Sequence, residues 1–467
     1  MSKRYFLDPF GCAKNQVDAE TMMAGLDAAG WTVCADALDA DLIIVNSCGF
    51  IEKAKRESIN AVLSWRSLYP EKKILLSGCL PQRYPAELAE SLTEADGFFG
   101  NGDLSRIAEA AASVSGNGKK TPDAEQTGLE KTGPEQIGPE KTGPAGERPL
   151  LGFPGQAYVK ISEGCDNFCS FCAIPLIRGP LRSRSVSDIT EECKTLLGRG
   201  VKELCLIGQD LSSYRPSGGG DLCGLAAEIA GIKGDFWVRF LYLHPDHFPL
   251  ELPRFMRKDS RFLPYFDIPF QHGSPSVLKA MNREGSGESY LELLDRIRDV
   301  LPDAVIRSTF LTGFPGETED DFAMLVDFQQ KARFDWLGVF VYSREEGTPA
   351  YSMRQRVAKK TAESRKALIE KNQISITEKR MDRFVGRRMK VLVEEHLDGS
   401  FYLGRLFCQA PEVDGAALIH AGTGSSGALR AAGSTALETV LNAGDFVPCR
   451  VLRRAGFDLE VEPDGLS

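Results

Sequence analysis

The chain has 467 residues, 42% of them hydrophobic, and its 56 Lys and Arg against 65 Asp and Glu give a formal net charge of −9. This length suits about two to four domains, so length and composition together exclude a disulfide-stapled miniprotein and a wholly disordered chain. The negative charge disfavours a polyanion such as nucleic acid or an anionic membrane, and it favours a basic protein as partner.

The sequence contains neither a recognisable membrane span nor an export signal. No segment approaches the roughly 18 uncharged apolar residues that a membrane helix needs, and the opening MSKRYFLDPFGCAKN lacks a long apolar segment. We therefore expect a cytoplasmic protein that makes no membrane contact. Its twelve cysteines should be reduced thiols, and clustered thiols in that compartment are more often metal ligands than disulfides.

The first unit, residues 1–112, alternates apolar strands with amphipathic helices, a pattern that predicts a parallel βαβ sheet. The expected elements are strands at 5–10, 41–47 and 73–78 and helices at about 15–29 and 52–67.

One cysteine follows each of these three strands: Cys12, Cys48 and Cys79. Because right-handed crossovers bring the carboxyl ends of parallel strands to one edge of the sheet, the three thiols should meet there. Taken alone, each could equally be an inert buried cysteine, which is a common environment for a free thiol. Their equivalent positions at three strand ends favour a shared site.

Residues 113–149 contain seven Gly and five Pro and no aromatic side chain, with the near-repeat EKTGPEQIGPEKTGPAGE. Such a composition cannot bury a core, so we expect a flexible linker here. A second boundary follows the charged helical run 359–383, where short strand-like pieces alternate with Gly-rich turns. The third unit is therefore expected at 382–454, followed by a tail at 455–467.

The second unit, residues 150–381, consists of repeated β/α segments. Its six expected strands are AYVKIS, ELCLIG, WVRFLYL, YFDIPF, AVIRSTFL and LGVFVYS. Six such strands suggest an incomplete TIM-like barrel, an architecture in which the carboxyl ends of the strands carry the chemistry. The segments that follow these strands, such as EGCDNFCSFC and TGFPGE, are rich in polar residues or Gly.

The strongest chemical signal is Cys165, Cys169 and Cys172, a C-x3-C-x2-C run after the first strand of this barrel. Cuboidal 4Fe-4S clusters normally take four cysteines, so a loop with three leaves one iron open to a chelating small molecule. Structural zinc is the alternative, but zinc usually needs a fourth Cys or His, and no such residue stands close by in the sequence.

This run resembles the radical S-adenosylmethionine signature, because an aromatic residue, Phe171, precedes its last cysteine. In that superfamily the open iron binds the amino and carboxylate groups of S-adenosylmethionine, and one electron cleaves the molecule to a 5'-deoxyadenosyl radical. The resemblance implies a 4Fe-4S cluster, S-adenosylmethionine, and an electron donor such as flavodoxin or ferredoxin. Since the cofactor supplies the difficult chemistry, no catalytic acid or base is expected from the chain.

The cysteines of the first unit lie in GCAKNQVDAE, NSCGFIEKAKRES and GCLPQRYPAEL, which resemble the amino-terminal motifs of methylthiotransferases. The resemblance implies that Cys12, Cys48 and Cys79 hold a second 4Fe-4S cluster, also with an open iron, that handles the inserted sulfur. The chain departs from the family at residues 8–10, Asp-Pro-Phe, where a Ser-Leu strand end is usual. Pro9 lacks the backbone donor that strand pairing uses.

Within this family, one branch modifies an adenosine of transfer RNA and another an aspartate of ribosomal protein uS12. The transfer-RNA enzymes typically have Gln-Asn where this chain has Gln209-Asp210, and Gln-Ser-Gly where it has Gln271-His272-Gly273. The resemblance therefore implies an enzyme that places SCH3 on the β-carbon of that aspartate, with uS12, free or in the small ribosomal subunit, as partner. The two clusters should face each other across one cavity.

The third unit resembles a TRAM domain, a small antiparallel β-barrel that binds transfer RNA in the nucleotide-modifying relatives. From Phe384 to Ser467 the chain has 8 Lys and Arg against 11 Asp and Glu, whereas a surface that follows RNA should be basic. We expect this barrel to dock on a basic protein rather than on transfer RNA, or to be an acidic surface with no partner. The alternatives are a transfer-RNA adenosine 2-methylthiotransferase and a non-catalytic, metal-stabilised RNA- or ribosome-binding module.

The resemblance also places S-adenosylmethionine near Phe171 and four further residues at strand ends, Gln209, Asp210, Gly313 and Glu317. The segment that begins at Gly313 could equally be a simple turn. His272 could touch substrate or be a hydrogen-bonded structural histidine. The remaining cysteines lack ligand-like spacing and are expected to be packing residues: Cys34, Cys193, Cys205, Cys223, Cys408 and Cys449.

Overall fold

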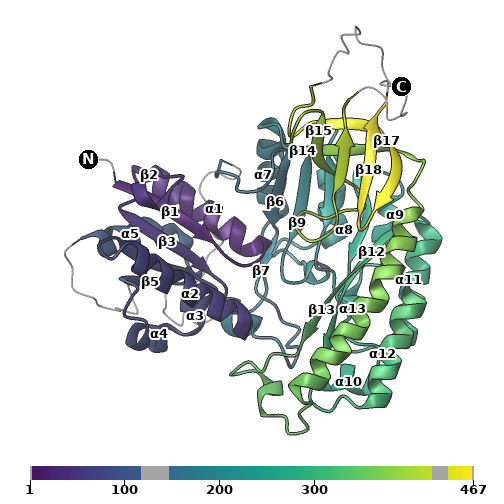
Figure 1. The fold of residues 1–467 in the computed structure, drawn as a ribbon, viewed down its shortest axis with the longest axis horizontal. Coiled ribbons are helices and arrows are strands. Elements are labelled where there is room, and N and C mark those ends of the chain that lie inside the picture. Colours follow the sequence, from purple (N-terminus) through teal and green to yellow (C-terminus); the bar gives the residue numbers. More distant parts are fainter. Residues whose placement is uncertain (1–2, 117–146, 423–439, 465–467) are drawn as a thin grey trace.

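The computed structural model describes residues 3–116, 147–422 and 440–464, which form three folded units (Figure 1). The predicted linker, 113–149, lies mostly outside the described residues. Its first described end is the last turn of a helix of the first unit, and its other end leads directly into the second unit.

The first unit is a five-stranded parallel sheet with helices on both faces, as the sequence predicts. The strand order is β2-β1-β3-β4-β5. The central strand is buried along its whole length because its LIIV run faces a helix layer on each side. The strands are β1 (Lys3–Pro9), β2 (Trp31–Val33), β3 (Leu42–Ser47), β4 (Lys73–Gly78) and β5 (Gly97–Phe99); the helices are α1 (Ala13–Ala28), α2 (Glu52–Leu68), α3 (Cys79–Arg83), α4 (Pro85–Ser91) and α5 (Ile107–Ser115).

Pro9 is accommodated because β1 has a neighbour on only one side at that point. β2 pairs only with the first three residues of β1, so the donor that Pro9 lacks would face a side with no strand. On the other side, the N–H of Phe10 donates to the carbonyl of Asn46 at 2.9 Å. The alignment with β3 therefore continues up to the turn that carries Cys12.

The second unit is the predicted partial barrel of six parallel strands, in the order β13-β12-β11-β10-β9-β6. No helix in the described ranges is both long and apolar enough to cross a membrane. The strands are β6 (Gln156–Lys160), β9 (Glu203–Ile207), β10 (Trp237–Phe240), β11 (Phe262–Asp267), β12 (Val305–Thr312) and β13 (Trp336–Val341), with a small pair β7 (Ser162–Glu163) and β8 (Arg182–Ser183); the helices are α6 (Ile174–Arg178), α7 (Val186–Gly198), α8 (Leu222–Ala230), α9 (Leu252–Met256), α10 (Pro275–Ala280), α11 (Gly287–Val300), α12 (Glu319–Ala332) and α13 (Lys359–Asp382).

The side chains of the core strands alternate between two environments, as expected for a sheet covered on both faces. One set, which includes Val159 and Phe266, packs against the outer helices. The other set, which includes Tyr158 and Tyr265, packs against the third unit, and α1 adds Val17 to the same cluster. The first and third units therefore both pack on the inner face of the core sheet.

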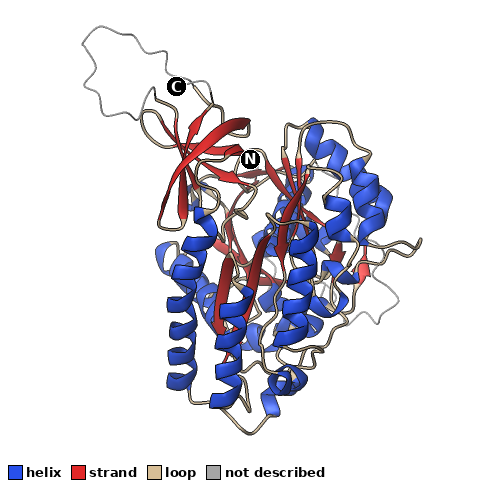
Figure 2. Cartoon of the chain, turned by 90° about the vertical axis from the view of Figure 1, so that its right-hand side faces the viewer, coloured by secondary structure: helices blue, strands red, loops and turns tan. Residues whose placement is uncertain are grey.

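The third unit is a closed five-stranded barrel at one end of the core (Figure 2). Its strands are β14 (Arg388–His396), β15 (Phe401–Leu406), β16 (Ala417–His420), β17 (Phe446–Ala455) and β18 (Asp458–Pro463). All neighbouring pairs are antiparallel except β16 and β18, which close the barrel as a parallel pair. The expectation of an antiparallel barrel is thus correct apart from this one seam.

The predicted boundary at 454 and the tail at 455–467 are wrong in one respect, since β18 lies inside that range. A turn at Gly456, where φ is +64°, reverses the chain, and the next residues pair with β17. The strand alternates buried Leu459 and Val461 with Glu460 and Glu462. Because the segment is short and rich in acidic residues, its alternation of apolar and charged residues is too weak to distinguish a strand from a solvated tail in the sequence.

Buried charges fasten the barrel to the core. Glu203 is fully buried and receives two guanidinium groups, Arg239 Nε at 2.7 Å from its own sheet and an η-nitrogen of Arg405 at 2.6 Å from the barrel. Arg239 also donates to the carbonyl of Phe407 at 2.9 Å. Although burial acts to raise the pKa of Glu203, the two guanidinium groups hold it below its usual value, so the carboxylate stays charged.

Glu203→Gln should lower the free energy of unfolding by about 3 to 5 kcal/mol, because the buried guanidinium of Arg239 loses its counter-charge and that of Arg405 loses one of two. Urea unfolding followed by tryptophan fluorescence measures this, since Trp237 and Trp336 belong to the interface cluster. The control is Asp235→Asn, which breaks an exposed 2.7 Å ion pair to Lys390 across the same two units and should change stability by less than about 1 kcal/mol. Equal losses of unfolding free energy in the two variants would contradict the assignment of Glu203 as the main charge that joins the barrel to the core.

Candidate functional site

Cys165, Cys169 and Cys172 lie in one loop between β7 and α6, at the carboxyl end of the first core strand. Backbone hydrogen bonds fix the path of this loop. The N–H of Cys165 donates to the carbonyl of Gly179 at 3.2 Å, and the N–H of Cys172 donates to that of Cys169 at 3.0 Å. The three thiols are thus presented together by a loop closed onto the end of α6.

Asp210 holds this loop from the neighbouring strand end. One carboxylate oxygen accepts hydrogen bonds from Asn167 Nδ2 at 2.8 Å and from Ser213 Oγ at 2.6 Å. The other oxygen accepts the N–H of Ser212 at 2.8 Å and so caps the turn that follows β9. Because Asn167 is part of the cysteine loop, Asp210 positions the loop rather than projecting freely into the site.

Gln209 and Phe171 also lie around the cysteine loop. Gln209 Nε2 donates to Glu163 Oε1 at 3.0 Å, immediately before the loop begins. Phe171 packs against an apolar cluster of core residues, Val277, Met281, Leu311, Phe314 and Ala350. A cavity of about 530 Å³ adjoins this cluster; it is lined by Ser276, Val277, Ala280, Pro315, Gly316, Met353, Arg354 and Gln355.

Glu317 and Gly313 form the turn after β12, and His272 lies nearby. The Glu317 carboxylate accepts the N–H of Gly313 at 2.6 Å and pairs with Arg365 of α13 at 2.7 Å. It is therefore occupied in shaping the turn, and burial raises its pKa. His272 is fully buried, its Nδ1 accepts the N–H of Ser274 at 3.0 Å, and burial lowers its pKa to about 3. His272 is thus a neutral, hydrogen-bonded residue within the core.

Cys12, Cys48 and Cys79 meet at the carboxyl edge of the first sheet, as its topology predicts. Cys12 is the N-cap residue of α1, Cys48 follows β3, and Cys79 begins α3 directly after β4. The chain at Gly49 passes so close to Cys79 that an added Cβ would lie 2.6 Å from the Cys79 carbonyl oxygen. Each thiol is within electrostatic reach of the other two.

The three thiols differ in their electrostatic surroundings. Desolvation raises the pKa of Cys79 to about 12 and also raises the pKa of Cys48. Desolvation opposes ionisation at Cys12 as well, but the cations of Lys14 and Arg178 outweigh it and lower the pKa of that thiol. The N–H groups at the amino end of α1 add to this effect.

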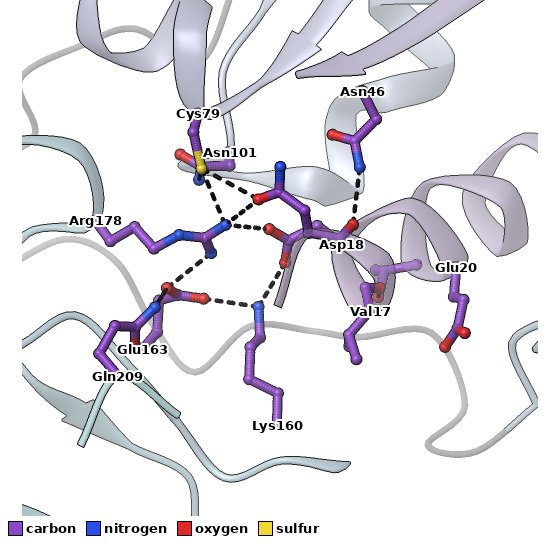
Figure 3. A network of polar contacts seen from close by, with 12 residues as sticks. Val17, Asp18, Glu20, Asn46, Cys79, Asn101, Lys160, Glu163, Arg178 and Gln209 are labelled. Atoms are coloured by element: carbon purple, nitrogen blue, oxygen red, sulfur yellow. Dashed lines mark hydrogen bonds and ion pairs between the residues drawn. The ribbon is translucent and has the colours of Figure 1, made fainter. Parts of the chain in front are cut away.

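Arg178, the last residue of α6, reaches from the core into the first unit (Figure 3). Its guanidinium donates to Asn15 Oδ1 at 2.7 Å and to Asp18 Oδ2 at 2.8 Å. The same nitrogen lies 3.2 Å from the sulfur of Cys79. Arg178 therefore connects the segment that follows one set of cysteines with a member of the other set.

Arg178 belongs to a buried network of two cations and two carboxylates, which we call the central network: Asp18, Lys160, Glu163 and Arg178. Lys160 Nζ lies 2.7 Å from both Asp18 and Glu163, and Arg178 lies 2.9 Å from Glu163 (Figure 3). All four residues are less than a tenth exposed. Each charge has a partner of opposite sign, which offsets the cost of burial.

A second buried ion pair joins the same two units at Glu345, on the loop after β13. Its carboxylate receives Lys55 Nζ at 3.0 Å and a guanidinium nitrogen of Arg83 at 2.8 Å, both from the first unit. Glu345 is only 2% exposed. A third contact is made by Arg148, which pairs with Glu20 of α1 at 2.8 Å and with a carboxylate of the core helix α7.

The donor chemistry of both cysteine sets fits iron-sulfur clusters. In the ranges that the structure describes, no three Cys, His, Asp or Glu side chains lie close enough together to hold a single metal ion. The ligands of a cuboidal cluster bind different irons, so they stand farther apart than the ligands of one zinc ion. If each set holds such a cluster, its three thiols would leave one iron without a cysteine ligand.

The sequence singled out the six cysteines as candidate ligands, but it gave no sign of the charged residues that join the two units. Arg178, Lys160 and Glu345 pair with residues more than a hundred positions away in the chain. No local pattern marks them, although Arg178 lies only six residues after Cys172 in a segment otherwise rich in apolar residues. Lys14 lies within the GCAKNQVDAE motif, but the chemistry of its buried ammonium is visible only in the structure.

Three family models match the chain in the order of its three units. They are the uncharacterized protein family UPF0004 at residues 4–100, the radical SAM superfamily at 159–328 and the TRAM domain at 385–463. Among solved structures, the radical S-adenosylmethionine methyltransferase TsrM from Kitasatospora setae has a TM-score of 0.54 at 15% identity, covering 75% of this chain and 77% of TsrM. The fold and the three-cysteine loop therefore define a radical SAM enzyme.

Curated relatives resemble the chain over nearly its whole length. Ribosomal protein uS12 methylthiotransferase RimO of Treponema denticola is 48% identical, covering 97% of this chain and 99% of the relative. The RimO proteins of Acetivibrio thermocellus and Thermotoga maritima are 39% and 40% identical and cover 98% and 88% of this chain. The chain belongs to the RimO family of radical S-adenosylmethionine methylthiotransferases, which confirms the family and enzyme class predicted from the sequence.

Asp210→Ala should weaken iron binding at the core cysteines by roughly tenfold, because a residue that orients a ligand loop contributes to metal affinity. Iron retained against a chelator after anaerobic reconstitution measures the effect. Asp221→Ala is the matched control, since Asp221 caps α8 through the N–H of Gly224 at 2.8 Å but does not touch the cysteine loop. Unchanged iron retention in Asp210→Ala would show that the loop needs no such support.

In the metal-free chain, iodoacetamide near neutral pH should alkylate Cys12 well before Cys79. The thiolate is the reactive form, so the lowered pKa of Cys12 gives it the larger reactive fraction. The rate at Cys79 should keep rising with pH toward its pKa of about 12. Time-resolved peptide mass spectrometry reads both sites, and faster labelling of Cys79 would contradict the electrostatic assignment.

Proposed function

We propose that this chain replaces a hydrogen on the β-carbon of one aspartate of ribosomal protein uS12 with a methylthio group, using S-adenosylmethionine. The observation that carries the proposal is that the segment following the core cysteines packs against a cysteine of the first unit. Arg178 follows one set in the chain and lies 3.2 Å from the sulfur of Cys79 in the other. The near full-length likeness to proteins named uS12 methylthiotransferase supports the substrate.

In this proposal, Cys165, Cys169 and Cys172 hold a 4Fe-4S cluster whose open iron takes S-adenosylmethionine, and the three cysteines of the first unit hold a second cluster. When bound, these groups supply the radical that removes a hydrogen atom and the sulfur that replaces it. The chain holds the two sites in a fixed relation through the central network. The first unit and the barrel cover the inner face of the core and so limit the access of water.

The residues expected around S-adenosylmethionine have two different roles in this proposal. Phe171 lines the apolar surroundings of the cysteine loop. Four other residues shape the loops at the carboxyl ends of β9 and β12 and act on the cofactor through those loops: Gln209, Asp210, Gly313 and Glu317.

Reductive cleavage of S-adenosylmethionine needs an electron donor, and we further propose flavodoxin or ferredoxin and a cytoplasmic location. A basic substrate protein suits a chain of net charge −9. The excess of acidic residues from Phe384 to Ser467 supports docking of protein rather than direct binding of transfer RNA by the barrel.

The test is the intact mass of uS12 incubated with the reconstituted enzyme, S-adenosylmethionine, a sulfur source and a reductant. Replacement of H by SCH3 adds about 46 Da to one aspartate. Cys169→Ser should abolish the shift, whereas Cys34→Ser, outside both sets, should retain it. A shift in transfer-RNA nucleosides instead of uS12 would overturn the proposed substrate, and the presence of zinc in place of about eight irons per chain would overturn the proposed chemistry.

A further inference from the structure

Lys14 is a buried cation at the interface between the first unit and the core. It is the second residue of α1, two positions after Cys12, and the residue is only 8% exposed. Its ammonium lies 3.2 Å from the centre of the Tyr242 ring, which the core presents just after β10. Figure 1 shows this end of α1 turned toward the core.

The ammonium of Lys14 has no carboxylate partner among the described residues. The nearby acidic groups are all engaged elsewhere. Asp18 and Glu163 are paired within the central network, and Asp267 pairs with Arg307 at 3.0 Å. A cation over a desolvated aromatic ring regains only part of the free energy that its burial costs.

The core holds Tyr242 against Lys14 in an unusual conformation. Tyr242 has φ of +66°, a region that bulky residues seldom occupy, and its N–H donates to Asp267 Oδ2 at 3.2 Å. Such strain persists only where the surroundings enforce it and is concentrated at functional sites. The aromatic ring therefore fixes the ammonium in place without neutralising its charge.

An anion would complete this site. The amino end of α1 carries a partial positive charge of its own, and its first turn has no acidic residue. This step rests on the proposed function, in which the substrate side chain is an aspartate carboxylate. Its carboxyl carbon is bonded directly to the β-carbon that reacts. An anion held by Lys14 would thus present that carbon beside Cys12.

We propose that Lys14 binds the carboxylate of the target aspartate and so selects aspartate as the substrate side chain. Lys14 is then a specificity-determining residue that orients the β-carbon between the two cysteine sets. The competing role is a general one, in which Lys14 only offsets the negative charge of the thiolates at the first unit. The two roles differ in one measurable respect, since only the first distinguishes aspartate from asparagine.

The experiment compares the binding of two fluorescently labelled forms of uS12 to the reconstituted enzyme, one natural and one with Asn in place of the target Asp. Unmodified enzyme should bind the natural form about tenfold more tightly, the value of a hydrogen bond to a charged group. Lys14→Gln should bind both forms equally, and Lys14→Arg should keep the preference. Lys3→Gln is the matched control, because Lys3 also lies over an aromatic ring, Trp31, but away from this interface.

The outcomes separate this inference from the proposed function. If unmodified enzyme methylthiolates uS12 yet binds the Asp and Asn forms equally, the inference fails while the function stands, and no variant is needed to reach that result. An equal loss of affinity for both forms in Lys14→Gln would assign Lys14 the general electrostatic role. If neither form of uS12 binds the unmodified enzyme, the proposed substrate fails and the inference fails with it.

Discussion

The arrangement of the site depends on the buried network of Asp18, Lys160, Glu163 and Arg178. The two cysteine sets belong to units that fold around separate cores, so their relative position is set only by what joins those units. Two carboxylates and two cations, each within 2.9 Å of a partner of opposite sign, fix that position. A network of directional contacts tolerates less sliding than an apolar interface of equal size, because a shift of one residue leaves charges buried and unpaired.

This constraint explains why Arg178 is an arginine. Its planar fork donates to several acceptors at once, and one nitrogen reaches Asp18 and the sulfur of Cys79 while the other holds Glu163. A lysine would supply the charge but not the fixed geometry. Glu345 and Arg148 add buried ion pairs at separate points of the same interface, so the first unit is held against rotation as well as translation.

The sequence predicted those parts of the fold that follow from local patterns of residues. Three apolar strands followed by Cys12, Cys48 and Cys79 were sufficient to predict the sheet and the meeting of the thiols, because parallel topology alone brings strand ends together. Glu345 could not be found in this way, since its partners lie about 260 to 290 residues distant and only tertiary packing joins them. The strand β18 was missed for a different reason: its apolar residues are few and its neighbours are acidic.

The charged residues near the cysteines are of two kinds, those whose charges are used to hold loops and one whose charge has no carboxylate partner among the described residues. Asp210 and Glu317 carry charges at strand ends, yet their oxygens are already occupied by hydrogen bonds that hold loops. Lys14 is the opposite case, because its charge is buried against an aromatic ring and has no carboxylate partner among the described residues. Paired charges stabilise a geometry, whereas a buried cation without a carboxylate partner leaves free energy to be gained from an anionic ligand. In our proposal, Lys14 is therefore the residue that binds the substrate's carboxylate, and the carboxylates at the strand ends are not.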